Sequence, residues 1–214
     1  MAATTVAQPG HDSADDVRAR YENVDHAYHE QRENRLLGFL LFLVSDVILF
    51  SMFIFAYCYL RNSVPNWPPI VEGGRQLPRF DVNFAAFNSV VLFGSGATMH
   101  FAMESWKHQN RQGFFRWLIA TIVLGIGFLG GQAYEYGSLA ISWAGSTMGA
   151  TFFTLTGMHG FHVFIGVIFL CVLGLQARSG VYTESKYFGL TAGTLYWHFV
   201  DVIWVALFFL FYLW

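Results

Sequence analysis

Charged residues are scarce in this chain, and their scarcity excludes an ordinary soluble domain. Only 12% of the 214 residues are Asp, Glu, Lys or Arg, which is about half the usual share of a soluble protein. The two cysteines, Cys58 and Cys171, both fall within long apolar stretches, so a disulfide framework is not expected. No Gly-rich phosphate loop, cysteine cluster or nucleophile elbow is present. The chain therefore shows no autonomous active site of a known pattern.

Long apolar segments are what the sequence has in abundance. Hydrophobic residues make up 55% of the chain, and 23 residues are Phe. A helix that spans a bilayer needs about 20 mostly apolar residues, and open sheets cannot span lipid. Five segments meet this length, at roughly 36–60, 84–106, 114–136, 150–177 and 190–214. The sequence therefore predicts an all-α fold, a polytopic transmembrane bundle of five helices.

The polar residues concentrate before the first span and predict an orientation. Residues 1–35 contain seven acids and four Arg, and they lack the apolar core of a secretory signal. We expect 1–35 to be a polar cytoplasmic arm and 36–214 to be the transmembrane domain. With the N-terminus inside, the cytoplasmic segments hold nine Lys and Arg and the external segments hold three. This imbalance favours a cytoplasmic N-terminus and an external C-terminus.

One carboxylate lies within the first span, in the sequence LLFLVSDVILFSMF of residues 40–53. Asp46 stands between one third and one half of the way along this apolar segment. An ionisable side chain at that depth is costly and is by default a candidate for function. The structural alternative is a carboxylate buried in a helix contact and hydrogen-bonded to Ser or Thr. The functional interpretation of Asp46 is lipid anchoring or proton exchange.

The last three spans contain further titratable residues, which we predict to form a buried polar cluster. These are Glu135, His159, His162, His198 and Asp201. His159 and His162 are three residues apart, as are His198 and Asp201, so each pair shares one helix face. Because a short connection joins the last two spans, we expect these two faces to meet. Polar residues at such depth are expected to face protein rather than lipid.

Paired histidines with a carboxylate are also a possible ligand set for zinc or iron. The same residues make good hydrogen-bonded helix contacts without a metal, and the spacing shows no matched histidines for a haem. We therefore expect no metal, no bound cofactor and no catalytic residue in this chain.

Two further predictions concern helix contacts. Gly127 and Gly131 are four residues apart and form a small-residue face of the kind that lets helices approach closely. His100 and Glu104 are also four residues apart, near the end of the second span, and we expect them to pair.

Several segments together resemble one family. VSDVILFSMFIFAY (44–57) resembles its carboxylate-bearing helix, and NWPPI (66–70) with FNSVVLFGSG (87–96) resembles the next loop and helix. GATFFTLTGMHGFHV (149–163) and YWHFVDVIW (196–204) resemble the last two helices. The segments occur in the family's order and cover most of the chain. The chain thus resembles subunit III of the haem-copper terminal oxidases, the respiratory complexes that reduce O2.

The resemblance implies more than the residues alone do. The common form of the family has seven transmembrane helices, so this chain resembles a short five-helix form in which the arm replaces the first two. Two helix groups are implied to flank a phospholipid-filled cleft beside subunit I, with Asp46 as the cleft carboxylate. The polar cluster is implied to lie in the packed second group. The implied location is the inner (plasma) membrane of a bacterial cell.

The implied role is non-catalytic. Subunits I and II hold the haems and copper of the complex, and subunit III stabilises subunit I, binds structural phospholipids and supports proton uptake and O2 access. It also protects the oxidase from inactivation during turnover. We expect oxidase subunits I and II, membrane lipids and the electron donor of the complex as partners, and no nucleic acid.

The electron donor stays open at this point. Many members carry Glu where Asp46 stands, and Asp occurs in quinol-oxidase relatives, whereas WPP and YWHFVDV favour the cytochrome c branch. Subunit III of a quinol oxidase and an accessory relative of nitric oxide reductase are alternatives. From another class, the alternatives are a stand-alone membrane metalloenzyme using His159, His162 and His198, and an ion carrier using Asp46 and Glu135. Carriers often contain internal repeats, and none is visible here.

Overall fold

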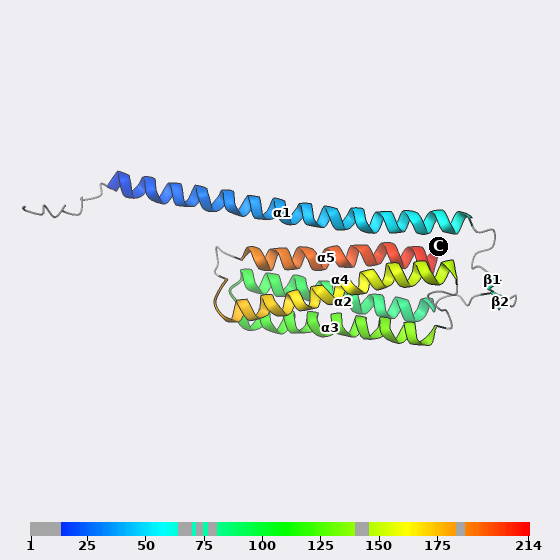
Figure 1. Cartoon of the computed structure of the whole chain (residues 1–214). Helices are drawn as coiled ribbons and strands as arrows, with labels where there is room; N and C mark the ends of the chain where they lie inside the picture. Colours follow the sequence, from blue (N-terminus) through cyan, green and yellow to red (C-terminus); the bar gives the residue numbers. More distant parts are fainter. Residues whose placement is uncertain (1–13, 64–69, 72–74, 77–80, 140–145, 183–186) are drawn as a thin grey trace, which may run out of the picture. The chain divides into compact units, whose positions relative to one another are not determined.

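The structure is a computed structural model that describes residues 14–63, 70–71, 75–76, 81–139, 146–182 and 187–214. Side chains are described for 33–63, 81–139, 146–182 and 187–214. The helices are α1 (Ala14–Ser63), α2 (Val82–Lys107), α3 (Arg111–Ser138), α4 (Thr147–Arg178) and α5 (Phe188–Phe208), and α5 continues into a π-helical segment, η1 (Phe209–Leu213) (Figure 1). A minimal antiparallel hairpin is formed by β1 (Ile70–Val71) and β2 (Arg75–Gln76), with Ile70 opposite Gln76.

Five helices among the described residues are long and apolar enough to cross a membrane. The spanning segments are Glu33–Ser63, Val82–Lys107, Arg111–Ser138, Thr147–Arg178 and Phe188–Leu213. Each one contains most or all of an apolar segment predicted from the sequence and extends beyond it at one or both ends. The predicted all-α bundle of five transmembrane helices is therefore confirmed.

Side-chain caps explain why three of the helices begin where they do. The carboxylate of Asp81 accepts hydrogen bonds from the backbone N–H groups of Asn83 and Phe84, at 3.0 and 3.2 Å. Asn110 caps α3 through its side-chain oxygen, 2.9 Å from the nitrogen of Gly113, and Ser146 does the same for α4. Such side chains satisfy backbone donors that have no partner within the helix.

The chain divides into two compact units, Met1–Leu41 and Phe42–Trp214. In the first unit, residues 14–41 form the beginning of α1. Residues 1–13 of the predicted arm and most of the NWPPI motif, residues 66–69, lie outside the described residues.

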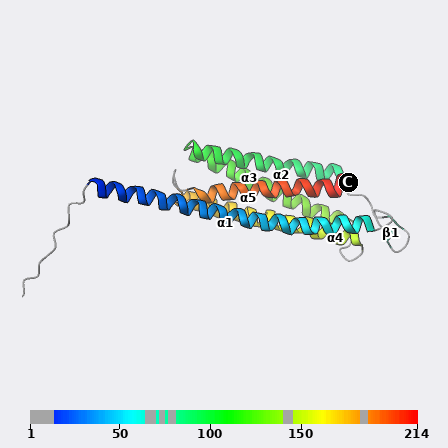
Figure 2. The same cartoon turned by 90° about the horizontal axis from the view of Figure 1, so that it is seen from above.

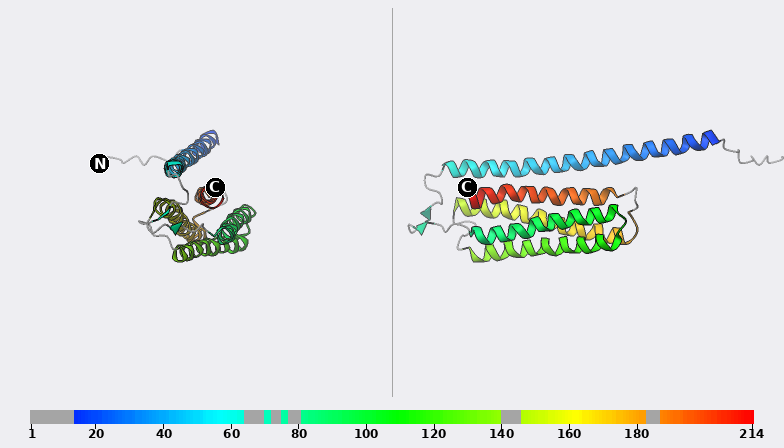
Figure 3. Two further views of the ribbon diagram at one scale, coloured as in Figure 1. Left: turned by 90° about the vertical axis from the view of Figure 1, so that its right-hand side faces the viewer. Right: turned by 180° about the vertical axis from the view of Figure 1, so that it is seen from behind.

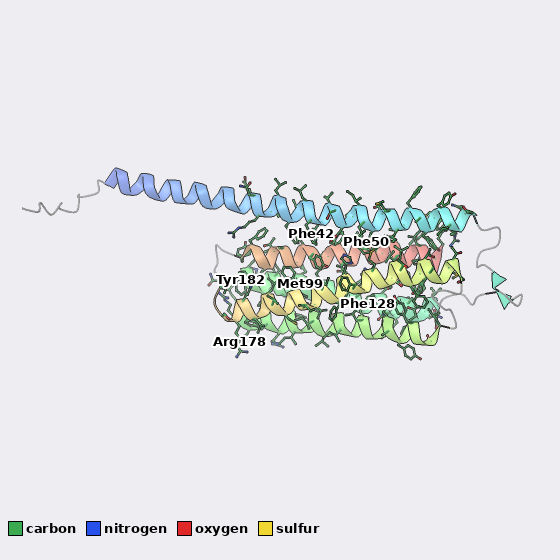
Figure 4. All side chains as sticks on the ribbon, in the orientation of Figure 1. Phe42, Phe50, Met99, Phe128, Arg178 and Tyr182 are labelled. Atoms are coloured by element: carbon green, nitrogen blue, oxygen red, sulfur yellow. The ribbon has the colours of Figure 1, made fainter. Side chains whose placement is uncertain are left out.

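The second unit contains a ring of four helices. Helix α2 packs against α3 and α5, and α4 packs against the same two helices, so the order around the ring is α2, α3, α4, α5. Figure 2 and the end-on view of Figure 3 show these four helices running alongside one another. Their shared core contains Phe128, Phe152, Trp197 and Trp204, each at most 1% exposed. Figure 4 labels Phe128 and Met99 within this core.

From Phe42 on, α1 belongs to the same unit and buries one narrow face. The buried side chains are Leu43, Asp46, Phe50 and Tyr57, whose spacing of three, four and seven residues places them on one side of the helix. The opposite side is apolar and exposed, with Met52 and Phe55 at 66% and 73%. In a membrane this exposed side is available to lipid or to another subunit.

Candidate functional site

Asp46 lies where α1 meets α4. Its carboxylate is 11% exposed, and its Oδ2 atom is 4.0 Å from Nε2 of His162. That separation fits a weak ion pair and is too long for a hydrogen bond, so Oδ2 has no hydrogen-bond partner among the described residues. The other ring nitrogen of His162, Nδ1, lies 2.8 Å from the carbonyl oxygen of Met158. Phe50, labelled in Figure 4, covers the imidazole, with 5.1 Å between the ring centroids.

A shallow apolar pocket lies further along the same junction. Its lining residues are Phe53, Ala56, Ala150, Thr151, Thr154 and Leu155, and they enclose about 190 Å³. The hydroxyl of Thr151 donates to carbonyl groups of its own helix, the nearer at 2.9 Å, and so presents little polarity to the pocket. The space suits an apolar chain rather than a polar ligand.

The C-terminal end of α1 is fastened to the end of the chain. The hydroxyl of Tyr57 donates to the carbonyl of Leu210 at 3.1 Å and accepts from the Arg61 guanidinium at 3.2 Å. Arg61 also donates to the carbonyl of Trp214, and its guanidinium carbon lies 4.3 Å from the centre of the Trp214 ring. Hydrogen bonds, a cation–π contact and ring packing therefore all join the C-terminal end of α1 to the last residues of the chain.

His159 is enclosed by aromatic rings inside the four-helix ring. It is 1% exposed, stacks on Trp204 with 5.0 Å between centroids, and meets the edge of Phe128 at 5.8 Å. Neither ring nitrogen has a hydrogen-bond partner among the described residues. Its environment is that of a packed aromatic side chain.

Glu135 lies at the opposite end of α3 from the α2–α3 connection and is held by neighbouring side chains. Its Oε1 accepts a hydrogen bond from the Tyr212 hydroxyl at 2.8 Å, and its Oε2 lies 3.4 Å from the amide nitrogen of Gln132. One residue along, the Tyr136 hydroxyl lies 2.7 Å from Thr156 Oγ1. These bonds tie α3 to η1 and to α4.

His198 and Asp201 pair with each other and face α2. Nδ1 of His198 is 3.6 Å from Oδ2 of Asp201, and the two side chains are 42% and 13% exposed. The Asp201 carboxylate presses against Gly96 so closely that a Cβ added at Gly96 would overlap it. Glycine at this position is what admits the carboxylate to the helix contact.

Two tryptophans connect α5 to α2. The indole N–H of Trp197 donates to Ser95 Oγ at 3.0 Å, and that of Trp204 donates to Ser89 Oγ at 2.8 Å. The tryptophans are seven residues apart and the serines six, so both bonds form along one antiparallel contact. A buried Trp needs a partner for its N–H, and the serines of the FNSVVLFGSG motif supply it.

The predicted polar cluster is therefore distributed over separate contacts. The structure pairs His162 with Asp46, His198 with Asp201, Glu135 with Tyr212, and His159 with aromatic rings. The expectation that the His198–Asp201 face meets the His159–His162 face is wrong, because the former lies against Gly96 of α2. Nowhere in the described part of the chain do three His, Cys, Asp or Glu side chains group as metal ligands would.

The two predicted helix contacts have different outcomes. The small-residue face of α3 is confirmed: Gly131 lies against the side chain of Asn88, and a Cβ at Gly127 would lie 3.8 Å from Val91, both on α2. The predicted pair of His100 and Glu104 is wrong. Glu104 pairs instead with Lys107 at 3.2 Å and with His108 at 3.1 Å, at the C-terminal end of α2.

Sequence reasoning missed the partners of several polar groups. Tyr57, Tyr212 and the two tryptophans were visible only as aromatic residues in apolar spans. The hydroxyl of a buried Tyr and the N–H of a buried Trp usually have a hydrogen-bond partner, so these residues could have been predicted to bond to a neighbouring helix. Outside the spans, Tyr182 gives the same kind of signal: its hydroxyl donates to Gln176, and burial raises the pKa of that hydroxyl.

As a whole, the arrangement is suited to packing and to holding an apolar ligand. Among the described residues, no nucleophile is paired with a base and oriented by a third group, as covalent catalysis requires. Several buried polar atoms have no hydrogen-bond partner among the described residues, including Oδ1 of Asp201, both ring nitrogens of His159 and Oδ2 of Asp46. Of these, Oδ2 of Asp46 lies at the contact of α1 with α4.

Comparisons with known proteins give one consistent result. The family model described as cytochrome c oxidase subunit III matches residues 16–214. Cytochrome c oxidase subunit 3 of Synechocystis sp. is 36% identical over 189 residues, covering 88% of this chain and 79% of that protein. The protein of the same name from Thermostichus vulcanus is 37% identical over 191 residues, covering 89% and 92%. That from Rhizopus stolonifer is 39% identical over 183 residues, covering 83% and 63%.

Proposed function

The chain belongs to the cytochrome c oxidase subunit III family, and we propose that it acts as the non-catalytic integral subunit III of a haem-copper terminal oxidase. The complex to which its relatives belong is an oxidoreductase of the respiratory chain, and this chain is a multi-pass membrane protein with five spanning helices. In the proposed role it supports the reduction of O2 to water, with proton translocation, without carrying a redox centre.

The proposal assigns the redox centres and the donor to other components. Subunits I and II hold the haems and copper, and this chain stabilises subunit I from the side. The relatives are named for cytochrome c oxidase, and this supports cytochrome c rather than quinol as the electron donor to the complex.

The proposed orientation places the N-terminus in the cytoplasm of a bacterial cell and the C-terminus outside its plasma membrane. The nine Lys and Arg of the N-terminal arm, the α2–α3 connection and the α4–α5 connection then lie inside, against three outside. In this arrangement 1–35 is the cytoplasmic arm and 36–214 is the membrane domain.

The proposed roles in lipid binding and proton uptake rest on the geometry of the junction between α1 and α4. Asp46 is buried there with one unbonded oxygen, and the apolar pocket at Phe53 lies two helical turns along the same contact. We propose that this junction opens on the lipid-filled cleft of the family, with Asp46 as its carboxylate. An acyl chain in the cleft supports the packing of α1, and the carboxylate supports proton uptake during sustained turnover.

The remaining titratable residues are proposed to be structural. Glu135, His159, His198 and Asp201 hold α3, α4, α5 and η1 in the ring through the contacts described above. Because these side chains contact neighbouring helices within the chain, their removal should act on assembly rather than on the chemistry at the haem.

The experiment that tests the proposed function is co-purification. An affinity tag is placed on this chain, native membranes are dissolved in mild detergent, and the eluate is examined for haem spectra and for its protein components. The expected result is recovery with a large haem-bearing subunit in a fixed ratio. Isolation of a stable, fully active haem-bearing oxidase from the same membranes, with this chain never present in it, would contradict the proposal.

A further inference from the structure

A second pocket lies at the other end of the bundle, beside the α2–α3 connection. It encloses about 400 Å³ and is lined by Ser105, Asn110, Gly113, Arg116, Trp117 and Ala120. Trp106, at the C-terminal end of α2, lies with its ring centre 6.3 Å from that of Tyr182. The pocket thus lies at the end of the bundle where Figure 4 labels Tyr182 and Arg178. The pocket is therefore separate from the α1–α4 junction.

Three side chains that line this pocket, Ser105, Asn110 and Arg116, carry hydrogen-bond donors. Arg116 is exposed and makes no hydrogen bond, ion pair or ring contact with another described residue. The side-chain oxygen of Asn110 is used as the helix cap at Gly113, so its NH2 group is left to face a ligand. A Cβ at Gly113 would lie 2.7 Å from that NH2 nitrogen and 3.1 Å from the Ser105 hydroxyl oxygen, so the absence of a side chain there leaves room for both groups.

The charge around the pocket is positive. Residues 105–134 contain no Asp or Glu, whereas Lys107, Arg111 and Arg116 all fall within this segment. The nearest acid in sequence, Glu104, is already paired with Lys107 and His108. Arg111 lies over the ring of Trp106, with 3.9 Å from the guanidinium carbon to the ring centre, and keeps its charge at the rim.

The pocket also borders an apolar surface of the kind that meets lipid. Trp117 is 41% exposed and packs on Phe101, itself 49% exposed, with 5.2 Å between the rings. Further into the span, Ile119 and Val123 are 58% and 60% exposed. Exposed tryptophans concentrate at membrane interfaces, with their polar edge toward the headgroups and their rings toward the acyl chains. A basic pocket directly above an apolar face is complementary to a lipid with a negative headgroup.

We propose that the pocket formed by Ser105, Asn110, Arg116 and Trp117 binds the phosphodiester headgroup of an anionic phospholipid of the phosphatidylglycerol type. Arg116 pairs with the phosphate, the Ser105 hydroxyl and the Asn110 amide donate to its oxygens, and an acyl chain runs along Phe101 and Trp117. A zwitterionic lipid fits less well, because none of the described residues that line the pocket is a carboxylate able to receive its ammonium group. This site does not depend on the identity of the electron donor or on the role of Asp46.

The test uses the intact complex purified through a tag on this chain, with three single variants. Arg116→Gln removes the proposed phosphate partner, and Ser105→Ala removes one donor. Arg178→Gln is the matched control, since Arg178 is an exposed cation at the same end of the bundle that does not line the pocket. Each complex is delipidated in mild detergent and titrated with phosphatidylglycerol or phosphatidylcholine of the same acyl chains, and bound lipid is counted by native mass spectrometry.

The wild-type complex and the Arg178→Gln complex should bind one more phosphatidylglycerol than the Arg116→Gln complex, or bind it about tenfold more tightly. Ser105→Ala should weaken the same binding severalfold, phosphatidylcholine should not replace it, and millimolar inorganic phosphate should not displace it. Equal binding by Arg116→Gln and wild type overturns the proposal, as does equal loss in Arg178→Gln. Efficient displacement by inorganic phosphate assigns the pocket to a soluble anion and also overturns it.

A partner subunit is the competing occupant. If a photo-reactive group introduced at Trp117 cross-links in native membranes to another subunit and to no lipid, the pocket is a protein interface and the proposal is wrong. If Arg116→Gln fails to assemble, the Ser105→Ala titration decides the question alone: unchanged binding of phosphatidylglycerol overturns the proposal.

Discussion

The ring of Trp197 lies so close to the backbone of Gly166 that a Cβ added at the glycine would stand 2.9 Å from the Cζ3 atom of the indole. The other edge of the same ring lies against Gly125, where an added Cβ would stand 2.8 Å from Cη2. Together with its hydrogen bond to Ser95, Trp197 thus contacts α2, α3 and α4 from its place on α5. One side chain thus contacts the three other helices of the ring.

The first prediction follows from this close approach. Gly166→Ala should destabilise the bundle by about 1–3 kcal/mol, because the rigid indole cannot move aside without disturbing three helices. Gly130→Ala is the matched control, since nothing lies within 4 Å of a Cβ at that position on α3. The measurement is the temperature at which half of this chain is lost from the purified complex. A midpoint for Gly166→Ala equal to that of the control would show that the ring tolerates the added methyl group.

The second prediction concerns the attachment of α1 at its C-terminal end. Tyr57→Phe removes the hydroxyl that joins Arg61 to the carbonyl of Leu210 and should cost about 1 kcal/mol. Tyr59→Phe removes the same group from a side chain that is 64% exposed on the same helix, and should have no effect. Limited proteolysis of the purified complex measures the release of α1. Indistinguishable cleavage rates for the two variants would mean that the Tyr57 bond does not hold the helix.

The third prediction concerns Asp201. Asp201→Ala should lower the yield of assembled complex, because it leaves His198 without its partner and a gap against Gly96. Because the His198 side chain is 42% exposed, the expected cost is about 1–3 kcal/mol, as for an unsatisfied polar group rather than for a fully buried ion pair. O2 consumption per haem should be unchanged in whatever complex forms. Normal yield with collapsed turnover per haem would make the residue functional rather than structural.

The fourth prediction is chemical labelling of Asp46. A hydrophobic carbodiimide partitions into the membrane and should react with this carboxyl before Glu135, which is enclosed by Tyr212 and Gln132 inside the bundle. Asp46 lies on the face of α1 that meets the apolar junction and has an oxygen without a hydrogen-bond partner among the described residues. Peptide mass spectrometry locates the label, and Asp46→Asn is the control that should abolish it. Preferential labelling of Glu135 would place the accessible carboxyl elsewhere.

The spans themselves were predictable from the sequence, because length and apolarity are local properties that decide whether a helix can cross a membrane. The segment around Asp46 is an example: it was predicted at 36–60, and the structure places the span at Glu33–Ser63. The small-residue contact at Gly127 and Gly131 was predictable for a similar reason, since spacing alone places both glycines on one face.

The pairing of the polar side chains was not predictable, because it depends on how each helix is rotated in the bundle. His198 and Asp201 were expected to face α4, but Tyr196 and Trp197 take that side: Tyr196 donates to the carbonyl of His162 at 3.1 Å, and Trp197 lies against Gly166. The histidine and the acid are consequently turned toward α2. The helix is rotated so that its aromatic residues face α4, and the spacing of the polar residues alone does not specify this rotation.

The role proposed for Asp46 is tested by the time course of O2 reduction in a fully assembled Asp46→Asn complex. The variant keeps the size of the side chain and removes its ability to carry a proton, and haem content confirms assembly. We expect a near-normal initial rate per haem, followed by weaker proton pumping or fewer turnovers before half of the activity is lost. A haem-replete Asp46→Asn complex with no initial activity would instead place Asp46 on the essential proton route, and the supporting role proposed for it would be wrong.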